Sequence, residues 1–401
     1  MKSVGNWERL GMKFKLGDIC SRLSSGKGIS AKLIDDVGKF PVYGGNGLRG
    51  YTAQSNFFGE CAIIGRQGAF CGNVRYFSGE AYMTEHAIVV CANKDNNTRY
   101  LAYLLGIMKL GRLSGQSAQP GLSVKTLAQQ DVDMPPLEQQ RKVAKILATI
   151  QKKIELNNKI NENLEQQAVL LFKKWFIEFN NTSRSMIETR FGLIPDSFKL
   201  LKNGELPLVV TDYVANGSFA SLKANVTLYQ EPNYAYFIRN TDLKSGTFEV
   251  FVDEHSYNFL SKSTLYGGEI IISNVGDVGS VFLCPKLDKP MTLGNNIIML
   301  RPEQENLRYY LYIWFKWLYG QSLIQGIKGG SAQPKFNKTD FKNLPIFLPP
   351  DKLLKQFHQI VKPMFELIDK NSTENQALTI TRDALLPKLM SGELDVSNID
   401  I

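Results

Sequence analysis

Two long stretches of the chain carry the same alternation of apolar and polar positions. Apolar residues return in steps of four and three from Val143 to Trp175, and again from Phe357 to Leu389. This spacing is typical of the seam of a coiled coil. Each stretch predicts an amphipathic helix of about 33 residues, near 50 Å long at roughly 1.5 Å per residue.

The two stripes match position by position when the numbering is shifted by 357 − 143 = 214. Both hold two asparagines at their centre, and only Arg382 breaks the apolar match. A buried polar pair in an apolar seam costs stability but fixes the register of two helices. If the helices pack antiparallel about a shared centre, Asn157 meets Asn375 and Asn161 meets Asn371. The matched positions are Val143, Leu147, Ile150, Ile154, Asn157, Asn161, Leu164, Ala168, Leu171 and Trp175 in the first stripe, and Phe357, Val361, Met364, Ile368, Asn371, Asn375, Leu378, Arg382, Leu385 and Leu389 in the second.

Proline pairs mark where both helices begin. Pro135-Pro136 and Pro349-Pro350 precede the stripes, and proline is tolerated in the first helical turn. Glu138 and Asp351 follow at the positive end of each helix, where an acid is favourable. Pro363 lies inside the second helix and is expected to kink it or to interrupt its hydrogen bonds.

The offset of 214 also relates two short motifs before the helices, "GQSAQP" from residue 115 and "GGSAQP" from residue 329. Ser123 and Asn337 follow them as candidate helix N-caps. We interpret the motifs as structural junctions between globular region and helix. The alternative is a nucleic-acid contact through the glutamine of each copy, Gln119 and Gln333.

Short apolar runs punctuated by glycine fill residues 1–114 and about 185–345, which predicts mixed α/β (α+β) heads dominated by strands. "GECAIIGRQGAFCGNV" from Gly59 and "GGEIIISNVGDVGSV" from Gly267 suggest that the heads are related, with Gly59-Glu60 aligned to Gly268-Glu269. The predicted order is head, helix, head, helix, a pseudo-two-fold repeat with antiparallel helices. The runs are Phe40–Tyr43, Cys61–Ile64, Ala87–Cys91, Tyr234–Ile238, Glu269–Ile272 and Asn296–Leu300.

Composition places the chain among globular proteins of more than one domain, with 401 residues, 43% hydrophobic and 21% charged. Its apolar runs are too short to span a membrane, and its first residues lack the apolar core of a signal peptide. Five cysteines without C-x-x-C spacing predict reduced thiols and a cytoplasmic protein. The three histidines have no cysteine at ligand spacing, so no metal site is expected.

The net charge of +9 indicates a polyanionic partner. Residues 1–114 hold 15 Lys and Arg against 8 Asp and Glu, whereas residues 181–328 hold 14 of each. If both heads contact nucleic acid, the second head must use a local patch.

Motifs for catalysis are missing from the sequence. In "SSGKGIS" Gly28 stands where a P-loop needs Ser or Thr, so a turn that carries Lys27 toward a DNA backbone is the better interpretation. An adenine methyltransferase needs an aromatic residue after its Pro-Pro pair, but Leu137 and Asp351 follow the pairs here. Asp196 and Lys199 in "PDSFK" have no second acid at the spacing of a metal nuclease.

Motifs in a fixed order give the chain a family resemblance. "FPVYGGNGLRGY", "GQSAQP…LS…MPPLEQQ", "GLIPDSF", "DYVANGSF" and "RDALLPKLMSGEL" resemble conserved segments of type I restriction-modification specificity subunits over nearly the whole chain. One departure is that Asp351-Lys352-Leu353-Leu354-Lys355 stands where the first copy has Leu137-Glu138-Gln139-Gln140-Arg141. Contacts of Glu138 and Gln139 are therefore not transferred to the second helix.

The resemblance implies two target recognition domains separated by two conserved helical regions. The implied boundaries are 1–134, 135–182, 183–348 and 349–393. It also implies a non-catalytic subunit that binds a bipartite site on double-stranded DNA. Its partners would be two adenine-N6 methyltransferase subunits, which bind S-adenosylmethionine, and restriction (nuclease and translocase) subunits. The chain itself would need no cofactor and no membrane.

Glycine-flanked polar loops supply candidates for DNA contact, because glycine lets a backbone approach a groove and Arg, Lys, Asn, Gln, Ser and Thr distinguish base edges. The alternative for each is a solvated loop residue. "YYLYIWFKWLYG" (309–320) fits a buried amphipathic helix better than a base-stacking platform. The candidates are Lys27, Asn46, Arg49, Arg66, Gln67 and Arg75 in the first head, and Asn216, Ser218, Arg239, Asn240, Asn274 and Lys328 in the second, with Asp277 beside them.

Three functions remain open on sequence alone. The first is a DNA specificity subunit, and a variant of it is the recognition subunit of a type II-like methyltransferase and nuclease fusion. The second is a coiled-coil scaffold, which the repeat alone permits but the basic glycine loops disfavour. The third, a self-sufficient methyltransferase, is disfavoured by the missing motifs.

Overall fold

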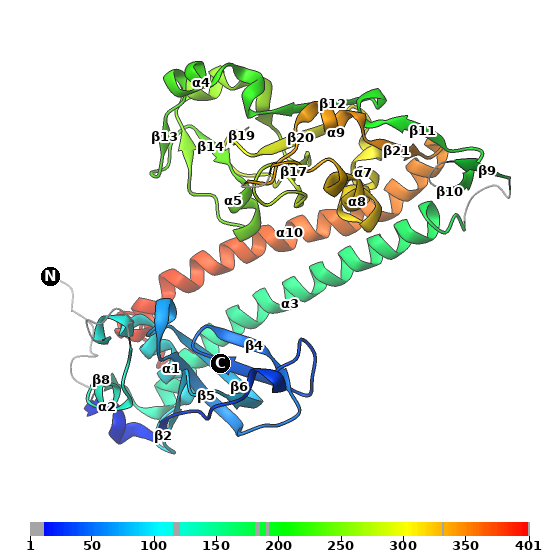
Figure 1. Ribbon diagram of the computed structural model, residues 1–401. Coiled ribbons are helices and arrows are strands. Elements are labelled where there is room, and N and C mark those ends of the chain that lie inside the picture. The colour runs from blue at the N-terminus through cyan, green and yellow to red at the C-terminus, as the bar shows by residue number, and fades with distance from the viewer. Residues whose placement is uncertain (1–11, 115–120, 181–184, 190–191, 331–332, 400–401) are drawn as a thin grey trace. The chain divides into compact units, whose positions relative to one another are not determined.

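The computed structural model describes residues 12–114, 121–180, 185–189, 192–330 and 333–399. The chain forms two compact units. Unit 1 comprises Met1–Asn157 and Thr373–Ile401, and unit 2 comprises Asn158–Ser372. Both units contain part of each long helix, α3 (Leu137–Phe176) and α10 (Asp351–Met390) (Figure 1). The division between the units therefore falls within the helices rather than at their ends.

Unit 1 is built on a six-stranded sheet of order β2-β7-β5-β6-β3-β4, in which only β3 and β6 pair in parallel. Its core joins apolar residues of β5, β7 and α1 to the beginning of α3 and the end of α10. The elements are β1 (Met12–Lys15), β2 (Cys20–Ser25), β3 (Phe40–Gly44), β4 (Gly47–Thr52), β5 (Phe57–Gly65), β6 (Val74–Met83), β7 (Ala87–Ala92), α1 (Thr98–Ile107), α2 (Val124–Ala128) and β8 (Asp131–Met134).

Unit 2 holds a four-stranded sheet, β12-β20-β17-β18, and a five-stranded sheet, β13-β15-β14-β19-β16. The strands and helices are β9 (Met186–Thr189), β10 (Gly192–Pro195), β11 (Lys199–Lys202), β12 (Leu208–Asp212), α4 (Phe219–Asn225), β13 (Leu228–Tyr229), β14 (Ala235–Ile238), α5 (Asn240–Ser245), β15 (Phe251–Val252), α6 (Glu254–Phe259), β16 (Thr264–Leu265), β17 (Ile270–Ser273), β18 (Val281–Leu283), β19 (Met291–Leu293), β20 (Ile297–Pro302), α7 (Arg308–Lys316), α8 (Leu318–Gly326), α9 (Lys338–Asn343) and β21 (Pro345–Leu348).

Helix α7 shows why aromatic residues crowd residues 309–315. All seven side chains from Tyr309 to Phe315 are buried, and Trp314 and Tyr310 are among the largest fully buried side chains of the chain. They pack in the core of unit 2 with Phe172 and Phe357 from the long helices. The prediction of a buried helix is thus confirmed for residues 309–315, whereas residues 318–320 belong to the next helix, α8.

In both units a two-stranded antiparallel ladder lies directly before the long helix. β1 pairs with β8 from Met12↔Met134 to Lys15↔Asp131, and β11 pairs with β21 from Lys199↔Leu348 to Lys202↔Pro345. The strands β8 and β21 begin at Asp131 and Pro345, which are related by the predicted offset of 214. Gly17 and Gly204 follow the first strands, and a Cβ atom on either would lie 3.3 Å from the helix that precedes the second strand, at Ala128 of α2 or at Lys342 of α9.

The N-caps predicted after the repeated motifs are confirmed. The Ser123 hydroxyl accepts from the backbone N–H of Thr126 at 2.9 Å, and the Asn337 side chain accepts from that of Asp340 at 2.8 Å. The first motif, with Gln119, lies outside the described residues. In the second, the carbonyl of Pro334 accepts from Gly276 N–H at 2.8 Å, which ties this junction to the sheet of unit 2.

The predicted alignment of Gly59-Glu60 with Gly268-Glu269 is wrong by one residue. Ile63 pairs with Val89 in unit 1, and Ile271 pairs with Met299 in unit 2. Because β7 and β20 correspond at an offset of 210, Ile63 corresponds to Ile271 and the offset there is 208. A slip of one residue would turn every side chain of the strand to the opposite face of the sheet. The burial of the side chains therefore determines which residues correspond, and the sequence similarity alone does not.

The central asparagines of the seam pair as predicted. In unit 1 the Asn157 amide donates to Asn375 Oδ1 at 2.9 Å and to a Glu374 carboxylate oxygen at 2.7 Å. In unit 2 the Asn371 amide donates to Asn161 Oδ1 at 2.8 Å. The pairing makes α3 and α10 antiparallel neighbours in each unit. All twenty stripe positions are buried or half-buried.

One prediction for the helices needs correction. Each helix extends beyond its predicted stripe at both ends, and α3 and α10 are both 40 residues long. Helix α10 continues through Pro363, where the missing backbone N–H interrupts the helical hydrogen bonds at one position, as predicted. Proline removes one backbone donor, and the neighbouring side chains Val361 and Phe365 are buried in the core of unit 2, which holds the turn in place.

Two further findings concern the described ranges only. Among their helices there is none with the length and apolar character needed to cross a membrane. The same ranges contain no group of three or more His, Cys, Asp and Glu side chains placed to hold a metal ion.

The asparagine pair of unit 2 gives a stability prediction. Asn371→Leu leaves Asn161 without its 2.8 Å partner in a seam, so we expect the free energy of unfolding to fall by about 1–3 kcal/mol. Asn161→Leu/Asn371→Leu should recover most of this loss, because both polar groups are then removed. Denaturant unfolding of the two single variants and the double variant measures the coupling, and additive losses would contradict a direct pair.

Candidate DNA-recognition site

In unit 1 a glycine loop lies against two arginines. The loop Gly44–Gly47 joins β3 to β4 and carries Asn46 exposed at its tip. A Cβ atom on Gly44 would lie 2.7 Å from the Arg49 side chain, and one on Gly47 would lie 3.1 Å from the Arg75 guanidinium. Gly47 also has a φ of 102°, which favours glycine. The glycines therefore let both arginines pack on the loop backbone.

The end of β5 brings a second group to the same loop. Arg66 donates its backbone N–H to the His86 carbonyl at 3.0 Å and a guanidinium N–H to the Glu85 carbonyl at 3.4 Å. Gln67 Oε1 lies 3.2 Å from His86 Nδ1. A Cβ atom on Gly45 would lie 2.9 Å from the His86 carbonyl. The loop, the strand end and the turn Thr84–His86 are thus in direct contact.

Lys27, which follows β2, joins this group. Its backbone N–H donates to the Met83 carbonyl at 2.9 Å, beside the turn, and its side chain is exposed. The structure therefore brings the six candidates of unit 1 together around one end of the sheet. Gln67, Asn46, Arg49 and Arg75 are exposed, whereas Arg66 is half-buried.

Unit 2 repeats the backbone of this arrangement. Asn274 follows β17 and donates its N–H to the Asn296 carbonyl at 3.1 Å, as Arg66 donates to His86. Gly294 donates to the Ile238 carbonyl at 2.8 Å, as Thr84 donates to Tyr43 at 2.9 Å. We call this arrangement the strand-end frame. It comprises Gly44–Gly47, Arg66–Gln67 and Thr84–His86 in unit 1, and Arg239–Asn240, Asn274–Val275 and Gly294–Asn296 in unit 2.

The junction after each repeated motif closes the frame. The carbonyl of Arg66 accepts from Leu122 at 2.8 Å, and that of Asn274 accepts from Phe336 at 3.0 Å. Leu122 and Phe336 are again related by the offset of 214. The motifs therefore lead into residues that pair with the strand ends, which supports their interpretation as structural junctions.

Two ion pairs lie at the frame of unit 2, one formed by Arg239 within it and one formed by Lys244 and Asp277 beside it. Asp242, which is buried, holds the Arg239 guanidinium through Nε and Nη2, with the shortest N–O distance 2.6 Å. Lys244 lies 2.5 Å from the Asp277 carboxylate, which also accepts from Ser280. Both contacts, that with Lys244 first, lower the pKa of Asp277, and Asn240 adds a third hydrogen bond.

The remaining candidates of unit 2 have different surroundings. Asn216 donates to Ser263 Oγ at 2.7 Å and accepts from Lys262 N–H, so its amide holds a turn. Ser218 caps α4. Lys328 is exposed beside Gly329, which bridges to Lys335 and through it to Val275 of the frame. The described contacts of Asn216 and Ser218 do not reach the frame.

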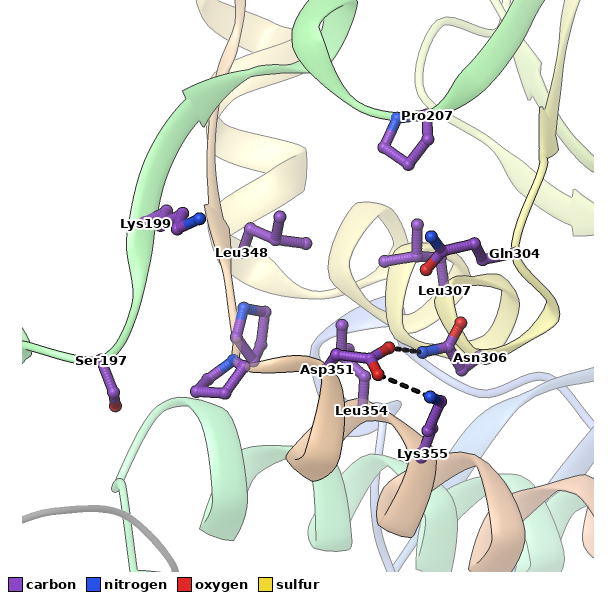
Figure 2. A pocket seen from close by; sticks show the side chains of 12 residues that line it. Ser197, Lys199, Pro207, Gln304, Asn306, Leu307, Leu348, Asp351, Leu354 and Lys355 are labelled. Carbon is purple, nitrogen blue, oxygen red and sulfur yellow. Dashed lines mark hydrogen bonds and ion pairs between the residues drawn. The ribbon is translucent and has the colours of Figure 1, made fainter.

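A cavity of about 570 Å³ lies elsewhere in unit 2, where α10 begins. Figure 2 shows Asp351 bound to the Asn306 amide at 2.8 Å and to Lys355 at 2.7 Å. At the matched place in unit 1, Gln140 is buried and bonds to Asn96 and to the backbone of Pro135 and Asn97. Leu354 replaces this glutamine in unit 2, so the contacts of Gln140 have no counterpart there.

Comparison with known proteins identifies the family. The pattern of the type I restriction modification DNA specificity domain matches residues 9–166 and 210–381, one copy in each half of the chain. The chain belongs to the type I restriction-modification specificity subunits.

Individual relatives of this family show the extent of the similarity. The MjaIX specificity subunit of Methanocaldococcus jannaschii is 28% identical over 75% of this chain and 70% of its own length. The EcoprrI specificity subunit of Escherichia coli is 39% identical, but over only 34% of this chain and 35% of its own length. The crystal structure of a type I S subunit from M. genitalium shares the fold, with a TM-score of 0.61, 17% identity and coverage of 97% and 98% of the two chains.

Sequence reasoning missed the turn of the frame. Glu85 and His86 in unit 1, and Asn295 and Asn296 in unit 2, are not flanked by glycine on both sides and were not among the candidates. A signal was present in "GNN" (294–296), where two amides directly precede a buried strand. Only the backbone contacts of the turn show that it belongs with the predicted loops.

The ion pair between Lys244 and Asp277 gives a prediction about pH dependence. A lowered pKa means that the ionised Asp277 stabilises the fold above its ordinary pKa of 3.8, and that this contribution is lost as the pH falls through the lower value. Lys244→Met should raise the pKa of Asp277 back toward 3.8, and Ser280→Ala should raise it less. Carbon-13 NMR titration of the carboxyl group measures this, and an unchanged pKa in Lys244→Met would show that the ion pair is not the main cause.

Proposed function

We propose that this specificity subunit reads a bipartite target on double-stranded DNA, one half-site through each unit. One observation carries the proposal: both units repeat the strand-end frame with the same backbone bonds but different polar side chains. Base edges in the major groove differ in their donors and acceptors. One backbone with two sets of side chains is therefore suited to read two different half-sites.

The charge distribution supports DNA as the ligand. The net charge is +9, and residues 1–114 contribute 15 − 8 = +7 of it. Phosphate contacts supply most of the sequence-independent affinity of such proteins, and base contacts supply the specificity. In unit 2, Arg239 and Lys244 are paired with acids, so neutral amides have the larger role there.

The proposal includes the partners that the sequence predicts. Two methyltransferase subunits bind the chain, hold S-adenosylmethionine and methylate adenine at N6, and restriction subunits join the same complex in the cytoplasm. The chain is non-catalytic and binds no cofactor. Its five cysteines are all free thiols in the structure, as the reducing cytoplasm favours. A scaffold protein without DNA specificity would not require two frames with different polar side chains.

Reconstitution tests the non-catalytic role. The purified chain alone should transfer no methyl group to DNA, because the methyl donor binds to its partners. Addition of its methyltransferase subunits should produce N6-methyladenine at a bipartite site, detected by single-molecule sequencing of the product DNA. Methylation by the isolated chain would contradict the proposal.

Variants of the frame test whether each unit recognises one half-site. Gln67→Ala should change or abolish recognition of one half-site, and Asn240→Ala should affect the other, because each side chain belongs to one unit. The loss of one good base contact corresponds to roughly 1–3 kcal/mol of discrimination. Methylation mapping on a randomised duplex library measures the preference at every position.

Gln129→Ala and Asn343→Ala are matched controls, since these exposed residues are related by the offset of 214 and lie outside the frame, Gln129 directly after α2 and Asn343 as the last residue of α9. Both should leave the two half-sites unchanged. If Gln67→Ala or Asn240→Ala weakened methylation equally on all sequences, these side chains would be phosphate contacts.

A further inference from the structure

The turn between β19 and β20 presents two side-chain amides at the centre of the frame in unit 2. Asn295 and Asn296 are both exposed, whereas Leu293 and Ile297 on either side are buried. Within the described part of the chain, neither amide takes part in a hydrogen bond with another residue. Asn296 is also one of the non-glycine residues with a positive φ, 65°. Exposed amides without internal partners are available to an external ligand.

The backbone of this turn is fixed on both sides. Gly294 donates to the Ile238 carbonyl, directly before Arg239-Asn240, and the Asn296 carbonyl accepts from Asn274. A Cβ atom on Gly294 would lie 2.6 Å from the same Ile238 carbonyl, so the turn fits closely. The turn is therefore held between the two loops that the sequence predicts to contact DNA, and little backbone conformational entropy remains to be lost on binding.

Unit 1 has the same turn with other chemistry. Glu85 and His86 stand at the places of Asn295 and Asn296, and His86 contacts Gln67 at 3.2 Å and Glu85 at 3.2 Å. Two backbone hydrogen bonds of the turn are kept between the units and the side chains are not. The turns also differ at one backbone position, because Asn296 has a positive φ and His86 has not.

We propose that the Asn295-Asn296 turn is a base-reading element of unit 2 that recognises adenine in the major groove. An asparagine amide can donate to adenine N7 and accept from its N6 amino group, a pair of contacts that no other base offers in that groove. The proposal rests on the function proposed above and adds to it a segment and a base.

The experiment separates base reading from the turn conformation. Asn296→Gly removes the amide and keeps the left-handed backbone, which glycine adopts freely, and Asn295→Ala removes the neighbouring amide. Each variant is assembled with the methyltransferase subunits and assayed by methylation mapping on a randomised duplex library. At least one variant should lose preference for adenine at one position of one half-site, by roughly 5- to 150-fold.

The other half-site is the internal control and should keep its sequence in both variants. Thermal midpoints equal to that of the unsubstituted chain show that the fold is intact. Unchanged preference in the double variant Asn295→Ala/Asn296→Gly, or an equal loss on all sequences with a reduced salt dependence, would overturn the inference. Failure of the unsubstituted complex to methylate any bipartite site would instead overturn the proposed function, and the inference with it.

Discussion

The pairing of asparagines at the centre of the helical seam is the constraint on which the rest of the structure depends. In a seam of leucine-like residues, every register that keeps apolar side chains together has a similar energy. The amide N–H groups of Asn157 in unit 1 and of Asn371 in unit 2 find the side-chain oxygens of Asn375 and Asn161 in the observed register, and a shifted register would place these amides against apolar side chains. In that register Leu389 reaches the core of unit 1, and Phe357 reaches the core of unit 2.

Each unit joins its sheet to this seam through a short ladder and a buried helix entry. The ladders are related by the offset of 214 between their second strands, but the helix entries differ. Gln140 ties the backbone at Asn97 to α3, whereas Asp351 takes the amide of Asn306 at the start of α10. Different polar contacts therefore hold the start of the long helix in the two units. In unit 2 a cavity lies beside these contacts.

The strand-end frame combines constant and variable parts. Three of its backbone hydrogen bonds are the same in both units, because each strand end is held by the turn on one side and by the junction after the repeated motif on the other. Its side chains differ, with Arg66 and His86 in one unit and Asn274 and Asn296 in the other. Under the proposed function, such an arrangement would allow the recognised bases to change while the fold is kept.

The sequence by itself determined the repeat, the helical stripes, the pairing of their asparagines, the N-caps at Ser123 and Asn337, and the family. These features depend on local periodicity and on spacing, which the order of residues carries directly. Only the tertiary structure decided the strand register at Ile271, the internal bonds of Asn216, and the place of Asn295 and Asn296 beside Asn240. These features depend on contacts between residues distant in the chain, where burial and hydrogen bonding select one partner among many that the sequence permits equally.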